Sequence, residues 1–345
     1  MLLNKHSVFI LLSCFKIVVC PLYDQIKGLS KPSSQAQFQP QHTPITIFKH
    51  YLFKTDGEGH GLDLAFPHWS VQWQVLMAQT SSVSNKSSVK ETHAFLRSLD
   101  PLQGVSQISL EEAVRREDIN VAFICTENLS HEDNIRKFLQ AQKHVCVEYP
   151  MTMNYKAAVE LWDLAEEKGV ILHEEHIELL SEDYIQLKRE VEGKTLQEGT
   201  LHFTGGALKP GFGFPAFSGI ARLTWLVDLF GELSVTAAAL EEDSTNGYSK
   251  MTAKLITSDN RPLTWIEERQ PGLPRAKNIN FQFDSGSLTQ IPTAPRGTVG
   301  IFMQDLIHFS TKLAGQVTPE ELTKEKVRVL HCLELADKIQ QLCHS

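Results

Sequence analysis

The stretch Val145-Cys146-Val147-Glu148-Tyr149-Pro150 decides how this chain folds. Its apolar residues are typical of a short buried strand, and Pro150 marks the start of the following helix, so Glu148 and Tyr149 project from the strand end. In open α/β sheets, ligands bind at the carboxyl ends of the strands. A carboxylate and a phenol placed there can hold a cofactor and handle a proton. A capping Glu and a packing Tyr would leave the same pattern, so the structural alternative stays open.

Segments on both sides of this stretch alternate between strands and helices. Residues 121–125 form a continuous apolar run, as in a strand buried on both faces. Ser130 is expected to cap a helix over 131–139, and a second helix over 154–168 stops at Gly169. Another strand begins at Val170. This order predicts parallel βαβ units and therefore an α/β fold with a Rossmann-type sheet.

Beyond about residue 195 the pattern changes to strands with alternating polarity. An apolar helix over 220–230 and a final helix that begins at Thr318-Pro319 accompany them. Alternation of this kind predicts a large, mostly antiparallel sheet within an α+β domain. The expected strands are 200–204, 234–240, 251–257, 263–268 and 279–283. We therefore divide the chain into a partial dinucleotide-binding domain over 97–176 and a C-terminal sheet domain over 177–345.

Residues 1–96 differ in composition, being rich in Ser, Gln, Lys and Pro, and we expect a largely disordered leader. The apolar run within residues 1–20 is interrupted by Lys16 and is too short to span a bilayer. It fits a strand or an unstructured leader, with a signal peptide and secretion as the minor alternative. The sequence Gly57-Glu58-Gly59-His60-Gly61 has Leu62 in place of a third glycine, so we interpret it as a loop.

Charge and cysteine content narrow the function classes. The formal net charge is −8 and no basic run is present, which disfavours a nucleic-acid partner. The six cysteines show no disulfide spacing, and Cys125 and Cys146 lie inside apolar runs. Free buried thiols favour a reducing compartment, so we expect a cytoplasmic protein.

Two further segments carry candidate chemistry. In His173-Glu174-Glu175-His176-Ile177-Glu178, the carboxylates Glu174 and Glu178 lie four residues apart and share a side, where they could act as acid or base. The spacing is not H-E-x-x-H, so zinc-protease chemistry is not supported, and a solvated strand end is the alternative. The aromatic loop 211–219 could form a flat pocket wall or simply a lid on a core. Arg222 follows as a candidate cation for a ligand carboxylate.

The C-terminal helix carries four residues of zinc-ligating type: His331, Cys332, Cys343 and His344. His331 and Cys343 are twelve residues apart, which is about 18 Å along a continuous helix. One ion can take all four only if the helix ends early or a second chain contributes. Incidental thiols and imidazoles are the alternative.

These motifs carry a family resemblance. From Arg97 to His344 the chain resembles the biliverdin reductases, within the broader glucose-fructose oxidoreductase group. The segments that carry the resemblance are 107–113, 130–133, 144–152, 172–180, 212–226 and 330–333. Related sugar dehydrogenases have Glu-Lys-Pro where this chain has Glu148-Tyr149-Pro150, which favours the tetrapyrrole reductases over them.

The resemblance implies reduction of the central methine bridge of biliverdin by NADPH or NADH, giving bilirubin in haem catabolism. It implies a catalytic set of Tyr149, Glu148, Glu174, Glu178 and Arg222, with Tyr149 as the acid or orienting group. It implies a cofactor-binding set of Arg97, Asn128, Leu129, Ser130, His131, Glu148 and Tyr149. It also implies one zinc ion at His331, Cys332, Cys343 and His344, where His344 replaces a family cysteine, and a monomeric protein.

One departure from the family pattern is large. The first strand, the G-x-G-x-x-G turn, the first helix and the second strand are not recognisable before Arg97, although that segment normally supplies the pyrophosphate site. The segment 15–20 could occupy the place of the first strand. Two hypotheses follow: an active reductase, or a non-catalytic isoform that binds cofactor poorly and acts as a tetrapyrrole- or protein-binding module.

Overall fold

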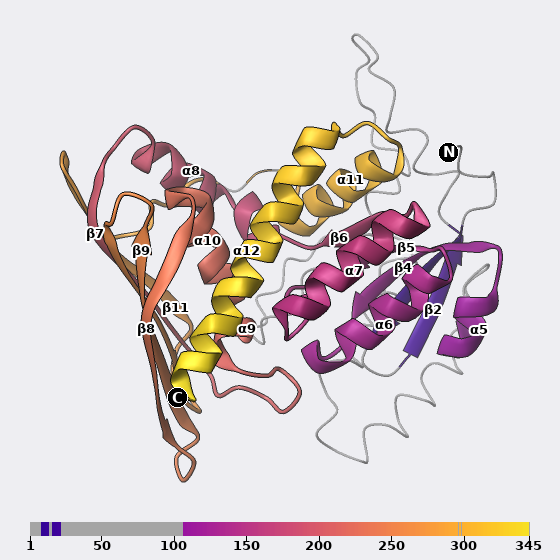
Figure 1. Ribbon diagram of the computed structural model, residues 1–345, viewed down its shortest axis with the longest axis horizontal. Coiled ribbons are helices and arrows are strands. Elements are labelled where there is room, and N and C mark those ends of the chain that lie inside the picture. The colour runs from indigo at the N-terminus through magenta and orange to yellow at the C-terminus, as the bar shows by residue number, and fades with distance from the viewer. Residues whose placement is uncertain (1–7, 14–15, 22–105, 296, 298, 345) are drawn as a thin grey trace, which may run out of the picture.

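The computed structural model describes residues 8–13, 16–21, 106–295, 297 and 299–344 (Figure 1). These residues form two sheets with helices packed against them. The C-terminal helix α12 (Pro319–Cys343) joins the two parts, because it contacts α7 beside the first sheet and both α10 and β8 of the second part. Arg97, the 57–61 glycine segment and the remainder of the predicted leader lie outside the described residues.

The first sheet has six strands in the order β3-β2-β1-β4-β5-β6. Strands β1, β4, β5 and β6 pair in parallel, whereas β2 is antiparallel to both of its neighbours, β1 and β3. The predicted α/β sheet is therefore confirmed in its parallel part. The strands are β1 (Val8–Ser13), β2 (Lys16–Pro21), β3 (Ser106–Ile108), β4 (Ile119–Cys125), β5 (His144–Val147) and β6 (Leu172–Glu174).

The N-terminal strands form a hairpin on the free side of β4. β1 pairs with β4 in parallel, and β2 returns antiparallel, with Ser13 opposite Lys16. The place of the first strand is thus filled by Val8–Ser13, and the expectation for segment 15–20 was wrong. The reason is strand direction: the place beside β4 requires a strand parallel to β4, and Lys16–Pro21 runs the other way.

Three helices accompany the first sheet: α5 (Leu110–Arg115), α6 (Asn128–Gln140) and α7 (Tyr155–Lys168). Helix α7 agrees with the prediction, with Asn154 as its N-cap and Gly169 at φ 65° after its last turn. Helix α6 begins earlier than expected. The Ser130 hydroxyl donates to the Glu127 carbonyl instead of accepting from a backbone N–H, so Ser130 is not the cap.

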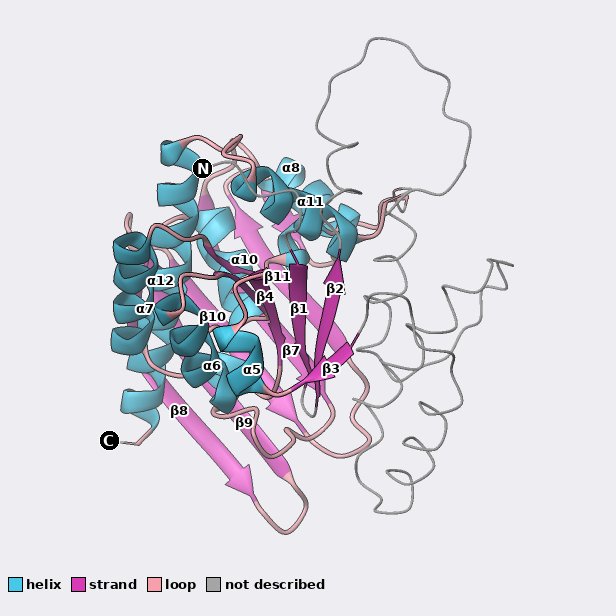
Figure 2. Ribbon diagram, turned by 90° about the vertical axis from the view of Figure 1, so that its right-hand side faces the viewer, coloured by secondary structure: helices cyan, strands magenta, loops and turns pink. Residues whose placement is uncertain are grey.

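The second sheet has the order β12-β11-β7-β10-β9-β8 and is antiparallel apart from the β7–β10 pair, as predicted. Figure 2 shows the first sheet in front of this larger one. The strands are β7 (Leu196–Gly205), β8 (Leu233–Asp243), β9 (Tyr248–Thr257), β10 (Pro262–Arg269), β11 (Ala276–Phe283) and β12 (Gly286–Leu288).

Helices cover one face of the second sheet and connect it to the first. The predicted helix over 220–230 is confirmed as α10 (Ile220–Phe230), and Thr318 and Glu321 form a capping box at the start of α12. The remaining elements are α9 (Pro215–Ser218), the 3-10 turn η2 (Ile177–Leu180), α8 (Glu182–Val191) and α11 (Ile301–Leu313). One apolar cluster runs from Phe138 beneath the first sheet to Trp265 in the second, so the two parts share a core. Among the described helices, none is long and apolar enough to cross a membrane.

Candidate active site

The end of β5 provides the first group of the site. Glu148 follows the strand, and its backbone N–H donates to the Ile124 carbonyl at 3.0 Å, which keeps it beside the end of β4. Burial raises the pKa of the Glu148 carboxyl to about 7, although a hydrogen bond with Cys125 opposes the shift. Near neutral pH this carboxyl is therefore poised to give or to accept a proton.

The end of β6 brings two more carboxyl groups to the same edge. Glu174 is 3% exposed, and its Oε2 accepts a hydrogen bond of 2.7 Å from the Met151 N–H, so this side chain supports the loop after β5. Burial raises the pKa of Glu174 to about 7. Glu175, the next residue, donates its N–H to the Val147 carbonyl at 2.8 Å.

Glu175 is a site residue that the sequence reasoning missed. Burial raises the pKa of its carboxyl well above the usual value, and the nearby carboxyls of Glu148 and Asp305 raise it further. The missing signal was strand register. Val147 pairs with Glu174, so the next residues along the two parallel strands, Glu148 and Glu175, are neighbours.

Tyr149, which follows Glu148, is within electrostatic reach of this acidic edge and of charged groups beside the second sheet. Burial, with Glu178 and Glu175, raises the pKa of its phenol well above 10, while Arg222 and Arg275 act in the opposite direction. The phenol is therefore uncharged at neutral pH and can donate a proton or a hydrogen bond. The same interactions place Tyr149, Glu178 and Arg222, which come from three separate segments of the sequence, within electrostatic reach of one another.

A cluster of cations lies on the face of the second sheet that α10 covers. Arg222 and Arg269 stack on the Phe203 ring, at 4.2 and 4.4 Å from its centroid. Both donate to Glu267, with Arg222 bidentate at 2.6 and 3.1 Å.

Lys277 lies 4.3 Å from the Trp225 ring and pairs with Glu178, which Arg275 also approaches at 3.9 Å. Burial works to raise the pKa of Glu178, but Lys277, Arg222 and Arg275 bring it below its usual value, so this carboxylate stays charged. Among the described residues, four cations thus gather beside the carboxylates Glu178 and Glu267. A cluster of cations suits an anionic ligand.

The predicted cofactor segment after β4 is joined to the aromatic loop. The Asn128 side-chain amide donates to the Phe212 carbonyl at 3.0 Å, and the Leu129 N–H donates to the Gly211 carbonyl at 3.2 Å. Gly213 has φ 77°, a backbone conformation that favours glycine, and it lies against the end of the Met153 side chain. The loop 211–219 is thereby brought to the edge where β4, β5 and β6 end.

His131 supports the site from beneath. Its ring is fully buried, with Nδ1 2.8 Å from the Pro150 carbonyl oxygen and Nε2 2.9 Å from that of Thr126. Burial lowers its pKa. The neutral ring can donate to one of these two carbonyls and contacts the loops after both β4 and β5. Leu129, by contrast, is 64% exposed and is available for contact with a ligand.

The described residues match only one half of a dinucleotide site. The ends of β4, β5 and β6 provide the edge where ligands of such sheets bind. Beside them, β1 turns straight back into β2, so no helix N-terminus follows the first strand in this part of the chain. The described residues therefore lack the usual pyrophosphate cradle.

The four candidate zinc ligands do not come together within one chain. Helix α12 runs without a break to Cys343, so it does not end early. His331 Nε2 accepts the Leu233 N–H at 3.1 Å, and burial raises the pKa of the Cys332 thiol to about 12. His344 packs against Phe214. These residues do not fit a single intrachain zinc site.

The comparisons with known proteins first define a class. Residues 73–176 match the family described as "Oxidoreductase family, NAD-binding Rossmann fold", a match that begins ahead of Arg97. Residues 184–295 match "Biliverdin reductase, catalytic". With the fold, these matches define an NAD(P)H-dependent oxidoreductase.

Closer relatives then define the family. The chain is 56% identical over 249 residues to biliverdin reductase A of Mus musculus, and 54% identical over 250 residues to that of Homo sapiens. Each match covers 72% of this chain and 84% of the relative. The chain belongs to the biliverdin reductase A family, which confirms the resemblance inferred from its motifs.

Solved structures agree on the fold. The biliverdin reductase of Synechocystis, in complex with biliverdin and NADP+, has a TM-score of 0.60 at 22% identity and covers 76% of this chain and 89% of its own. A 3-ketoreductase from Actinomadura kijaniata in complex with NADP has a TM-score of 0.56 at 18% identity, covering 67% and 79%. At these identities the likeness concerns the fold alone.

Proposed function

We propose that this chain reduces the central methine bridge of biliverdin to give bilirubin, using NADPH or NADH, as a step of haem catabolism. Family membership supports the reaction. The single observation that carries it is the cation cluster of Arg222, Arg269, Arg275 and Lys277 beside the neutral Tyr149 phenol. Biliverdin has two propionate groups on an extended apolar tetrapyrrole, so it suits a site that combines cations with aromatic rings.

The reaction adds one hydride to the methine carbon and one proton to a pyrrole nitrogen. A bound NAD(P)H would supply the hydride. The proton requires an acid of this chain, and the Glu148–Glu175 pair retains a proton near neutral pH because burial and mutual repulsion disfavour two charges. Tyr149, within electrostatic reach of Glu175 and Arg222, orients the tetrapyrrole or passes this proton to it.

The second candidate function is that of a non-catalytic family member that keeps the tetrapyrrole face but binds cofactor poorly. The observation in its favour is the β1–β2 hairpin, which occupies the place where a phosphate-binding turn and helix would follow the first strand. Such a chain would bind biliverdin without reducing it.

One experiment separates the two candidates. The purified full chain is titrated with NADPH by fluorescence, and bilirubin formation is then followed by absorbance. Micromolar NADPH binding with bilirubin formation contradicts the non-catalytic candidate. A folded chain that binds biliverdin but not NADPH contradicts the reductase assignment for this chain.

We also propose a monomeric, cytoplasmic protein. The free thiols of Cys146 and Cys332 support a reducing compartment. A zinc ion ligated by the whole C-terminal set would require two chains, since the continuous helix separates His331 from Cys343. Light scattering with and without added zinc tests both points, because zinc-dependent dimers would support the metal site and contradict the monomer.

A further inference from the structure

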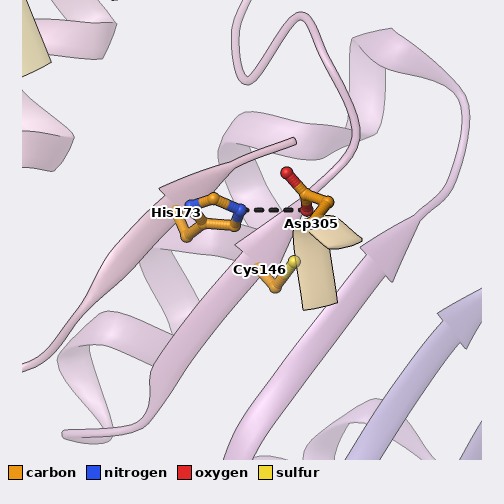
Figure 3. Close-up of side chains that lie close together, drawn as sticks. All are labelled: Cys146, His173 and Asp305. Atoms are coloured by element: carbon orange, nitrogen blue, oxygen red, sulfur yellow. Dashed lines mark hydrogen bonds and ion pairs between the residues drawn. The ribbon is translucent and has the colours of Figure 1, made fainter. Parts of the chain in front are cut away.

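The carboxylate of Asp305, on α11, holds one short segment of the chain at both ends. Its Oδ2 lies 3.0 Å from Nε2 of His173, and its Oδ1 accepts the backbone N–H of His176 at 3.3 Å. Figure 3 shows the His173 ring pointing at this carboxylate. The residues between these two contacts are Glu174 and Glu175, the acidic pair at the end of β6.

Lys312, in the last turn of α11, determines which His173 nitrogen carries the proton. Its ammonium group lies 2.6 Å from His173 Nδ1, and lysine can only donate, so Nδ1 must accept. Burial lowers the pKa of His173, which keeps the ring neutral with a single N–H. That N–H is therefore on Nε2 and is donated to Asp305.

The second helix of this region fixes Lys312 in turn. Glu325 of α12 forms an ion pair with Lys312 and a hydrogen bond with His308 of α11. The His173 ring also stacks on Phe309, with centroids 5.4 Å apart. Both helices are thus tied to the end of β6 through groups that, except for His308 and Glu325, are almost fully buried.

The placement of the segment is passed on to the loop that carries Tyr149. Glu174 accepts the Met151 N–H, and Glu175 donates its own N–H to Val147 at the end of β5. A movement of the 173–176 segment would therefore move both the Glu175 carboxyl and the loop after Glu148.

The same region contains a set of donors that a metal could use. One ligand atom each from Cys146, His173 and Asp305 lies within 4.8 Å of the others. However, the His173 Nε2 lone pair is not available, because Lys312 keeps the proton on that nitrogen. Lys312 also already supplies the positive charge that a metal would bring.

We propose that Asp305 is a positioning residue of this site, which fixes Glu174 and Glu175 through the His173 ring and the His176 amide, with Lys312 setting the ring tautomer. The placement stands on contacts alone. Its catalytic consequence rests on the proposed function. An Asn at position 305 would keep an acceptor for His176 but would turn an N–H donor toward the His173 N–H, which breaks one contact selectively.

Amide hydrogen exchange of the full chain tests the placement. In Asp305→Asn we expect the exchange rate of the Met151 amide to rise at least about tenfold while amides of β9 and β10 are unchanged. Lys312→Met should also raise the exchange rate of the Met151 amide. Lys312→Arg keeps the cation, so in this variant the Met151 amide should stay as protected as in the parent. The matched control is Asp163→Asn, the same change at an exposed helix position. Unchanged exchange at Met151 in both Asp305→Asn and Lys312→Met, or a uniform rise across both sheets, would overturn the proposal.

Kinetics separate positioning from general destabilisation. For Asp305→Asn we expect kcat to fall about tenfold with KM for biliverdin within about twofold of the parent, because the acids are displaced but the cation cluster is not. If the parent chain itself reduces no biliverdin, the proposed function fails while the exchange result still decides the placement. If added zinc chloride protects Cys146 from alkylation, a metal binds to this cluster. That result would overturn the statement that Lys312 takes the place of a metal there.

Discussion

Glu148 and Glu175 are neighbours at the ends of two parallel strands, and the charge of Glu148 raises the pKa of Glu175. Because burial already disfavours the charged forms, the pair keeps a proton at pH values where an exposed carboxyl has lost it. This proton is the one that we assign to the pyrrole nitrogen.

The pH profile of biliverdin reduction should report this pair. We expect kcat/KM to fall on the alkaline side, as the pair, whose pKa values burial raises, loses its last proton. Glu148→Gln removes one negative charge, which lowers the pKa of Glu175, so the alkaline limb should move to lower pH. Steady-state rates between pH 5 and 9 check this. A profile that is flat to pH 9 would contradict the assignment.

Folding stability should depend on Glu174 in a defined direction. Its pKa rises from 4.5 to about 7 on folding, so the folded state binds the extra proton between these values. Stability is therefore lost as the pH increases from about 4.5 through 7. Glu174→Gln keeps an acceptor for the Met151 N–H but cannot ionise. The free energy of unfolding of this variant, relative to that of the parent, should therefore be about 2 kcal/mol higher at pH 8 than at pH 5. Urea unfolding at both pH values measures this, with the exposed Glu160→Gln as control.

Tyr149→Phe tests the role of the phenol. Removal of the hydroxyl should lower kcat by roughly 10- to 100-fold and leave the melting temperature within a few degrees of the parent, because the ring still packs. Turnover and thermal melting on one preparation decide the matter. An unfolded variant would assign Tyr149 to packing instead.

Arg275→Gln tests recognition of the propionates. Losing one charged hydrogen bond should raise KM for biliverdin about tenfold, with no effect on the dimethyl ester, which lacks the charge. Arg261→Gln, at the turn between β9 and β10, serves as the matched control. An equal loss for both substrates would show that Arg275 does not bind a carboxylate.

The strands and helices that short-range sequence patterns specify were predicted correctly. The apolar run 121–125, the Asn154 and Gly169 caps and the 220–230 helix all appear as expected, because capping and periodicity act within one or two turns. Helix α11 went unnoticed, although Phe302, Leu306, Phe309 and Leu313 follow helical spacing.

The features that could not be predicted from the sequence depend on contacts between segments that are far apart in the chain. Glu175 joins the site through the register of β5 and β6, and Asp305 meets His173 across more than a hundred residues of chain. The place beside β4 is likewise taken by β1 because of strand direction, which is a relationship between distant segments. None of these relationships leaves a periodic trace in the sequence near the residues concerned.

The hairpin of β1 and β2 also protects the chain from self-association. Without it, β4 would offer a full row of unpaired backbone groups on an apolar strand, a template for strands of other chains. With it, the outermost strand is β3, which has only three residues. A protease cut that releases the hairpin should therefore turn a dispersed protein into an aggregating one.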